Sequence, residues 1–394
     1  MLGIHKAPHY TTIRQWVLKK GYYQIAHQIV EKAKDWVAIF DLTVDVGAMK
    51  CLLVLGARLQ PLLARDNCTL SHNDTQVLGI YFTTKSTGDF VSESLRSAEK
   101  KIGHPFAGLL LDQGSDVSKG ANIYSENLKE TIVVHDVSHK IAIVLEKHLK
   151  ADPAWRKFCD HITATKLAVQ QTTDLAALIP PKLRSKARYM SADVLMKWIT
   201  RFQESKQSGH MNSIDQKRLG KYFGWIDSLT IYIERWKQMI SIGETIKNLV
   251  SREGYSHETY LKLEDFVNSL DTAPQVINFI DDAMNTIWDE AEPLKPGQIA
   301  LGDSRVIEST FGKFKQSTSS QLQGITIGAL GIATFMSSNR IADVKIAMEN
   351  TTMGQVIKWG RECIGHSLAS MRRKFFPHKK RNKDSEIFIE KACA

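Results

Sequence analysis

The sequence predicts an α/β fold: a mixed sheet with flanking helices, interrupted by a large all-helical insertion. Strand and helix patterns alternate between residues 35 and 150. Apolar positions between residues 151 and 302 recur at helical spacing, with hardly any strand signal. The 394 residues, 43% of them hydrophobic, suffice for a large buried core. We therefore expect a sheet domain, 35–150, that residues 303–371 complete with further helices after the insertion.

The sheet is expected to begin with three consecutive strands. Residues 36–46 are rich in β-branched and aromatic side chains, and 50–56 form an apolar run after the turn at Gly47. Residues 77–83 form a third short run. Three consecutive strands of this kind favour an antiparallel meander.

A helix and two further strands follow the meander. Residues 89–101 carry apolar side chains at helical spacing and stop before Gly103. Residues 106–111 and 131–134 are short apolar runs, separated by a short helical or looped stretch. Three strands, a helix and two further strands follow one another in this order in the RNase H-like fold.

The insertion is predicted to consist of long amphipathic helices. Residues 219–241 and 257–270 have helical patterns, and residues 176–179 end at the pair Pro180-Pro181. Its large aromatic side chains are expected to lie mostly in the core of this helical domain. They are Trp198, Phe202, Trp225, Tyr232 and Trp236.

Residues 1–34 are interpreted as a partial helix-turn-helix or a basic DNA-binding arm. Ile13, Trp16 and Val17 recur at helical spacing, and Gly21 follows as the expected helix C-cap. The segment is too short for a complete helix-turn-helix, which leaves open whether further residues precede it.

Positive charge is concentrated at the two ends of the chain, whose formal net charge is +10. Residues 1–34 hold six Lys or Arg against one acid, and residues 372–383 hold seven with no acid. Basic ends around a nearly neutral body are typical of phosphate-binding arms, although a basic tail, here 372–394, can also be a solvated terminus. The tail residues expected to bind DNA are Arg372, Arg373, Lys374, Lys379, Lys380 and Arg381.

Composition excludes several other classes of protein. No run approaches the roughly 20 apolar residues of a membrane span, and the first twenty residues are polar and basic, unlike a signal peptide. We therefore expect a cytoplasmic, nucleoid-associated protein. The five cysteines are scattered and include no CxxC pair, so neither a disulfide framework nor a zinc finger is indicated. The glycines of 324–331 lack the spacing of a nucleotide-binding loop.

Three carboxylates are the candidate catalytic and metal-binding residues. Asp41 and Asp112 each end an apolar run, at a sheet edge where the backbone is rigid and the side chain reaches solvent. Glu308 lies in the helical pattern of 303–315. Mg²⁺ prefers hard oxygen ligands, and two ions about 3.5–4 Å apart can activate an attacking oxygen and stabilise a leaving one. We expect these three carboxylates to hold two Mg²⁺ or Mn²⁺ ions.

Each carboxylate has an alternative interpretation. An aspartate after a strand is often a turn or helix cap, and Asp45 and Asp116 are rivals for the roles of Asp41 and Asp112. Glu308 taken alone is most often a solvated helix residue. In the expected helix the apolar stripe comprises Ile307, Phe311 and Phe314, and a neighbouring face carries Ser304, Glu308 and Lys315.

Three segments of the chain resemble the catalytic blocks of bacterial insertion-sequence transposases with a DDE core. The first spans 35–56 and includes Trp36-Val-Ala-Ile-Phe-Asp41. The others are Asp112-Gln-Gly-Ser-Asp116, within 112–120, and Glu308-Ser-Thr-Phe-Gly-Lys313. The resemblance covers most of the chain and implies that Asp41, Asp112 and Glu308 are the metal-binding triad of an RNase H-like enzyme.

The layout is also similar to that of the hAT transposases, whose insertion before the last catalytic helix is helical. His139 stands at the histidine of their Cys-x-x-His motif, with Asp136 in place of the cysteine. The resemblance implies that His139 helps to place DNA near the scissile phosphate, although Asp136 departs from the motif. The alternative is a histidine at a helix start whose polar atoms are satisfied by its neighbours.

The sequence therefore predicts a DNA transposase that cleaves transposon-end DNA and transfers the freed strand into target DNA. It would act as a homo-oligomer on double-stranded DNA without a membrane partner, and Lys315 would meet a phosphate. A second hypothesis is a catalytically inactive DNA-binding inhibitor of transposition with the same body. A third is a nuclease or resolvase. The intact carboxylates favour an enzyme over the inhibitor, and joined strands would separate a transposase from a nuclease.

Overall fold

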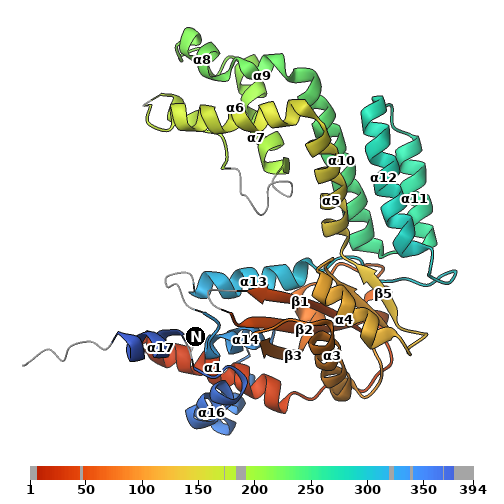
Figure 1. Cartoon of the computed structure of the whole chain (residues 1–394), viewed down its shortest axis with the longest axis vertical. Coiled ribbons are helices and arrows are strands. Elements are labelled where there is room, and N and C mark those ends of the chain that lie inside the picture. The colour runs from red at the N-terminus through yellow and green to blue at the C-terminus, as the bar shows by residue number, and fades with distance from the viewer. Residues whose placement is uncertain are drawn as a thin grey trace, which may run out of the picture.

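The protein consists of a sheet lobe and a helical lobe, which meet at one end of the sheet (Figure 1). This computed structural model describes residues 7–44, 48–172, 174–182, 192–318, 324–337, 340–366 and 368–376. The predicted mixed α/β architecture is confirmed. No helix within these described ranges is long and apolar enough to cross a membrane.

Five strands form one mixed sheet in the described part of the chain, in the order β3-β2-β1-β4-β5. The three strands of the predicted meander pair antiparallel, β1 with β2 and β2 with β3. The pairs β1–β4 and β4–β5 are parallel, so the carboxyl ends of these three strands lie at one edge. The strands are β1 (Trp36–Val44), β2 (Lys50–Arg58), β3 (Thr75–Thr83), β4 (Gly108–Leu111) and β5 (Ile132–His135).

The side chains of β1 alternate between two apolar cores, as the two-residue period of a strand requires. Ala38 and Phe40 belong to the core under α3 and α4, whereas Val37 and Ile39 belong to the core that continues into the helical lobe. A sheet covered on both faces has few polar positions, which explains the continuous apolar runs of β1 and β2. The elements between the strands are α2 (Leu59–Leu63), η1 (His72–Asp74), α3 (Gly88–Ile102) and α4 (Ser115–Ser125).

The helical lobe begins at Val137, so the first helix that follows β5 belongs to it. The predicted boundary at residue 150 had placed this helix, α5, in the sheet domain, but α5 packs against α10 and α12. The lobe contains α5 (Val137–Ala151), α6 (Pro153–Val169), η2 (Leu175–Leu178), α7 (Ala192–Gln207), α8 (Gln216–Phe223), α9 (Trp225–Ser228), α10 (Thr230–Glu253), α11 (His257–Asn268) and α12 (Pro274–Ala291).

The single helix predicted over 219–241 is wrong, because the chain forms α8, α9 and the start of α10 there. The break lies between Phe223 and Thr230, where Trp225 packs against Phe158 and His161 of α6. The Trp225 indole N–H donates to the Thr165 hydroxyl at 2.9 Å, and Ile226 is fully buried. Packing against α6 therefore overrides the local helical pattern.

Aromatic side chains form much of the core of the helical lobe, as predicted. Trp236 is fully buried, and its ring lies 4.9 Å from that of Trp155 and 5.3 Å from that of Phe158. Phe202 is also buried, and Trp198 and Trp225 are partly buried against this core. Tyr232 departs from the prediction, since its side chain is exposed.

The chain returns to the sheet lobe after α12 and ends in further helices. The first of them, α13, packs against β1. Its predicted apolar stripe is confirmed, because Ile307, Phe311 and Phe314 are all buried. These helices are α13 (Arg305–Thr318), η3 (Ile327–Ala329), α14 (Leu330–Phe335), α15 (Ile341–Asn350), α16 (Met353–Cys363) and α17 (Leu368–Phe375).

The N-terminal helix α1 (Tyr10–His27) packs against α14, α15 and α16 rather than standing apart as an arm (Figure 1). Its predicted stripe is not the buried one: Ile13 and Trp16 are exposed, and Leu18 lies in the core. The predicted C-cap at Gly21 is also wrong, since the helix continues six residues further to His27. A Cβ at Gly21 would lie 2.0 Å from the Leu330 carbonyl oxygen, so this glycine lets two helices touch.

Replacing Gly21 by alanine is expected to destabilise the protein by about 1–3 kcal/mol, because the new methyl group would force α1 away from α14. Alanine stabilises a helix by about 1 kcal/mol relative to glycine. The clash with α14 would therefore have to cost more than this gain in helix propensity. Gly220→Ala is the matched control, because Gly220 lies in α8 with no atom within 4 Å of a Cβ built there. Denaturant unfolding should show a loss for Gly21→Ala and none for Gly220→Ala. Equal effects would contradict the close contact.

Candidate functional site

Asp41 and Asp112 lie next to each other at the carboxyl ends of two parallel strands. The parallel register pairs Phe40 of β1 with Leu111 of β4, and the two aspartates are the next residues along the chain. Asp41 is still within β1, opposite Leu53, whereas Asp112 follows β4 directly. Both side chains are half-buried. The sheet therefore brings together two carboxylates that are 71 positions apart in the chain.

Burial raises the pKa of Asp41 to about 6, and the charge of Asp112 adds to this effect. The Leu42 N–H donates to Asp41 Oδ1 at 2.6 Å, and this bond opposes the rise, as do the charges of His139 and Lys315. A raised pKa means that the surrounding protein disfavours the ionised form of this aspartate. A nearby cation would stabilise the ionised form.

His139 of α5 contacts Asp112, with 2.7 Å between His139 Nδ1 and Asp112 Oδ1. The approach lies off the hydrogen-bond direction, so the contact is that of an ion pair. This contact with the Asp112 carboxylate raises the pKa of His139 although burial opposes it, and the charges of Asp136 and Glu308 raise it further. His139 thus lies among the carboxylates.

Glu308 of α13 is the third carboxylate and lies one turn from the start of its helix. Its side chain reaches solvent, yet the surrounding protein raises its pKa, and the charges of Asp136, Asp112 and Asp41 raise it further. The buried stripe of α13 fixes the helix against β1. The three sequence-predicted carboxylates therefore act electrostatically on one another, although they come from three separate elements.

A hollow of about 140 Å³ lies beside Glu308, between the two lobes. Glu308 and Arg305 line it from α13, Ser138 from α5, and Gly243 and Lys247 from α10. Arg305 is held by Asp303, with 2.7 Å between Arg305 Nε and Asp303 Oδ2. Two cationic side chains therefore share this hollow with Glu308 and with two further acidic side chains, Asp193 and Glu244.

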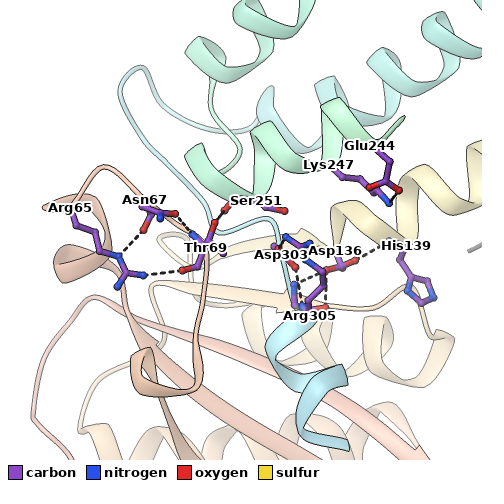
Figure 2. Close-up of polar contacts among 11 residues, drawn as sticks. Arg65, Asn67, Thr69, Asp136, His139, Glu244, Lys247, Ser251, Asp303 and Arg305 are labelled. Atoms are coloured by element: carbon purple, nitrogen blue, oxygen red, sulfur yellow. Dashed lines mark hydrogen bonds and ion pairs between the residues drawn. The ribbon is translucent and has the colours of Figure 1, made fainter. Parts of the chain in front are cut away.

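Asp136 lies between the start of α5 and the start of α13 (Figure 2). Its Oδ1 accepts the His139 backbone N–H at 2.9 Å, and its Oδ2 accepts the Ser304 N–H at 2.6 Å. The sequence shows the first of these contacts, because aspartate is a preferred helix N-cap. It gives no signal for the second, which joins residues 168 positions apart.

Of the two alternative aspartates, Asp45 and Asp116, the structure describes only Asp116. Asp45 lies outside the described residues. Asp116 lies in the first turn of α4, and its Oδ2 is 4.0 Å from Lys50 Nζ. The pKa of Asp41 responds to Asp112, with no contribution from Asp116 among its causes. Asp112 is therefore the better partner for Asp41.

The predicted DNA-binding cations lie in two places. Lys315 of α13 is exposed, and its charge acts on Asp41. Arg372 and Lys374 are exposed on α17. The side chain of Arg373 lies outside the described part, as do the remaining predicted tail residues, Lys379, Lys380 and Arg381.

Among the described residues, no group of three or more His, Cys, Asp or Glu side chains is arranged to hold a metal ion as it stands. The donors at the sheet edge are nonetheless carboxylate oxygens, the ligands that Mg²⁺ and Mn²⁺ prefer. Burial raises the pKa of Asp41 and Glu308, and the charge of Asp112 raises both further. The chemistry of this donor set fits a hard divalent cation.

No protein-family model matches the chain, and no curated protein matches it significantly in sequence.

Proposed function

We propose that this chain is a DNA transposase with an RNase H-like core, which cuts and joins DNA strands with the help of divalent metal ions. The strand order β3-β2-β1-β4-β5, with three antiparallel strands followed by two parallel ones, supports an RNase H-like core. The helical lobe lies between β5 and α13, which agrees with the layout inferred from the catalytic blocks.

The observation that carries the proposal is the position of Asp41 beside Asp112, in the parallel register of β1 and β4, with Glu308 of α13 close enough to feel both charges. Burial raises the pKa of Asp41 and of Glu308, and the charge of Asp112 raises both further. A fold that needed these positions only for stability would do better with neutral side chains. A carboxylate whose pKa is strongly raised, as that of Asp41 is, and that lies beside a second carboxylate is typical of a functional site.

Asp41, Asp112 and Glu308 would hold the metal ions. When bound, two divalent ions activate the attacking oxygen and stabilise the leaving oxygen of an in-line phosphoryl transfer. His139 and Lys315 would orient the scissile phosphate beside the carboxylates. The first attack, by water, frees a 3′-hydroxyl, and that hydroxyl then attacks target DNA without a covalent protein intermediate.

The direct test uses the purified chain with DNA that carries the sequences flanking its own coding region. Cleavage and strand joining should require Mg²⁺ or Mn²⁺ and stop in EDTA. Joined products distinguish a transposase from a nuclease. Firm DNA binding without any cleavage would instead favour an inhibitor of transposition.

Neutralising the basic tail should weaken DNA binding regardless of sequence. For every phosphate that the tail no longer neutralises, the slope of log affinity against log salt should fall by roughly 0.9. The variant replaces Arg372, Arg373, Lys374, Lys379, Lys380 and Arg381 by glutamine. Exchanging Arg and Lys at the same positions is the matched control, because it keeps the charge. A salt slope that glutamine leaves unchanged would identify the tail as a solvated terminus.

A further inference from the structure

We infer that Asp136 is a positioning residue that fixes three parts of the candidate site at once: the end of β4, the start of α5 and the start of α13. The inference rests on the proposed function for its effect on metal binding. Its geometric part, the anchoring of three elements by one buried residue through its side chain and its backbone N–H, can be tested separately.

The first anchor is the start of α5. Asp136 is the N-cap of this helix, and its Oδ1 accepts the His139 backbone N–H at 2.9 Å. This bond fixes the first turn of α5, from which the His139 side chain reaches Asp112. A change at Asp136 would therefore move His139 without touching its side chain.

The second anchor is the start of α13. Asp136 Oδ2 accepts two hydrogen bonds from Ser304, one from the backbone N–H at 2.6 Å and one from the hydroxyl at 2.8 Å. Ser304 is buried and directly precedes α13, on which Glu308 lies one turn further along. The carboxylate thus sets where this helix begins, and with it the position of Glu308.

The third anchor is the end of β4. The backbone N–H of Asp136 donates to the Leu111 carbonyl oxygen at 2.9 Å, and Asp112 is the next residue. Hydrogen bonds therefore link Asp136 to the three chain segments that carry Asp112, His139 and Glu308.

Asp136 is unsuited to be a metal ligand itself. It is 1% exposed, and both of its oxygens already accept hydrogen bonds from the protein. Hydrogen bonds to a carboxylate are stronger than those between neutral groups, so the arrangement is rigid. Its role is to act through the residues that it holds.

Other contacts should keep the two lobes joined when Asp136 is altered. The Val137 N–H donates to the Gly302 carbonyl oxygen at 2.8 Å, and Tyr255 and Ala300 exchange backbone hydrogen bonds of 2.7 and 3.0 Å. The Tyr255 hydroxyl also donates to the His135 carbonyl oxygen at 3.0 Å. An altered Asp136 is therefore expected to loosen the site while the fold persists.

The test compares Asp136→Asn with Asp152→Asn in the full chain. Asparagine keeps the side-chain shape, but its NH₂ group cannot accept a hydrogen bond. The side chain therefore loses its bond either to His139 or to Ser304. Asp152 is a matched control, because its Oδ1 accepts the Ala154 N–H at 2.9 Å and its Oδ2 accepts the Trp236 indole N–H at 3.0 Å, within the helical lobe. Mn²⁺ binding is measured by calorimetry, and exchange of the Ser304 and His139 amides by hydrogen exchange.

Asp136→Asn should weaken Mn²⁺ binding by about 10–100-fold, the usual effect of losing a partner that orients metal ligands. It should also speed amide exchange at Ser304 and His139, whereas Asp152→Asn should change neither. Ser304→Ala, which removes only the hydroxyl bond, should shift both readouts less in the same direction, and it serves as the second variant if Asp136→Asn does not fold.

The outcomes separate this inference from the proposed function. If the unmutated chain binds no Mn²⁺, the proposed function fails, and the amide exchange still decides whether Asp136 anchors the two helices. Unchanged exchange in Asp136→Asn and Ser304→Ala, or Mn²⁺ affinity equal to that of Asp152→Asn, would overturn the inference.

Discussion

Replacing Asp112 by asparagine is expected to abolish metal-dependent DNA cleavage while DNA binding persists. The substitution keeps the side-chain shape but removes a negative charge from a site that would hold two dications. The loss should exceed the roughly 100-fold effect typical of altering an outer partner of a metal ligand. Binding should survive, because the predicted phosphate contacts of the tail are separate from the sheet edge. Cleavage is measured with Mg²⁺, Mn²⁺ or EDTA, and binding by a shift assay.

Asp116→Asn is the matched control for this experiment. Asp116 lies four positions away and is the rival carboxylate, but its ion-pair partner is Lys50, at 4.0 Å. It should leave cleavage unchanged. Full activity of Asp112→Asn, or cleavage undisturbed by EDTA, would refute the metal mechanism. Loss of cleavage in Asp116→Asn alone would transfer the role to Asp116.

Replacing Glu290 by alanine should destabilise the protein by about 3–5 kcal/mol, because it leaves Lys140 buried without its partner. Glu290 of α12 pairs with Lys140 of α5, and its Oε2 accepts the His135 N–H at 2.9 Å. Both charged side chains of the pair are nearly inaccessible to solvent. The residue thus ties α12 to α5 and to the end of β5. Denaturant unfolding measures the effect, and Glu292→Ala, at an exposed position of the same region, should change stability by less than about 0.5 kcal/mol.

The same pair predicts how stability depends on pH. Burial alone would raise the pKa of Glu290, but the bonds from His135 and Lys140 outweigh it and hold the pKa below the ordinary value of 4.5. A carboxyl with a lowered pKa contributes stability above its unfolded value, and this contribution is lost as the pH falls through the folded value. The unmutated chain should therefore lose stability below pH 4.5 more steeply than Glu290→Gln. Parallel pH profiles would contradict the pairing.

The sequence predicts the sheet well because each strand has its own local signal. The runs at β1 and β2 are apolar at nearly every position, and α3 is bounded by its cap Thr87 and by Gly103 at φ 81°. The break between α8 and α10 has no such signal, since it depends on the contact between Trp225 and Thr165, 60 positions apart. The prediction of a C-cap at Gly21 is wrong for the same reason. The Leu330 carbonyl that leaves room only for glycine lies far along the chain, on α14.

The same distinction between local and long-range signals applies to the candidate site. Asp41 and Asp112 can be recognised because each ends an apolar run, and Glu308 because a helical stripe surrounds it. The contact of His139 with Asp112 and the two bonds from Ser304 to Asp136 arise only when α5 and α13 meet. Local pattern therefore identifies the carboxylates, whereas the groups that orient them require the folded chain.

The position of the helical lobe in the chain also determines when the site can form during synthesis. Asp136 and Ser304 are 168 positions apart, and every intervening residue must be made before they can bond. At roughly 5–20 residues per second, this takes on the order of 10–30 s. Throughout that interval the nascent chain carries Asp41 and Asp112 but has no Glu308. A ribosome-bound chain therefore lacks the third of the proposed metal-binding carboxylates until Glu308 has been made.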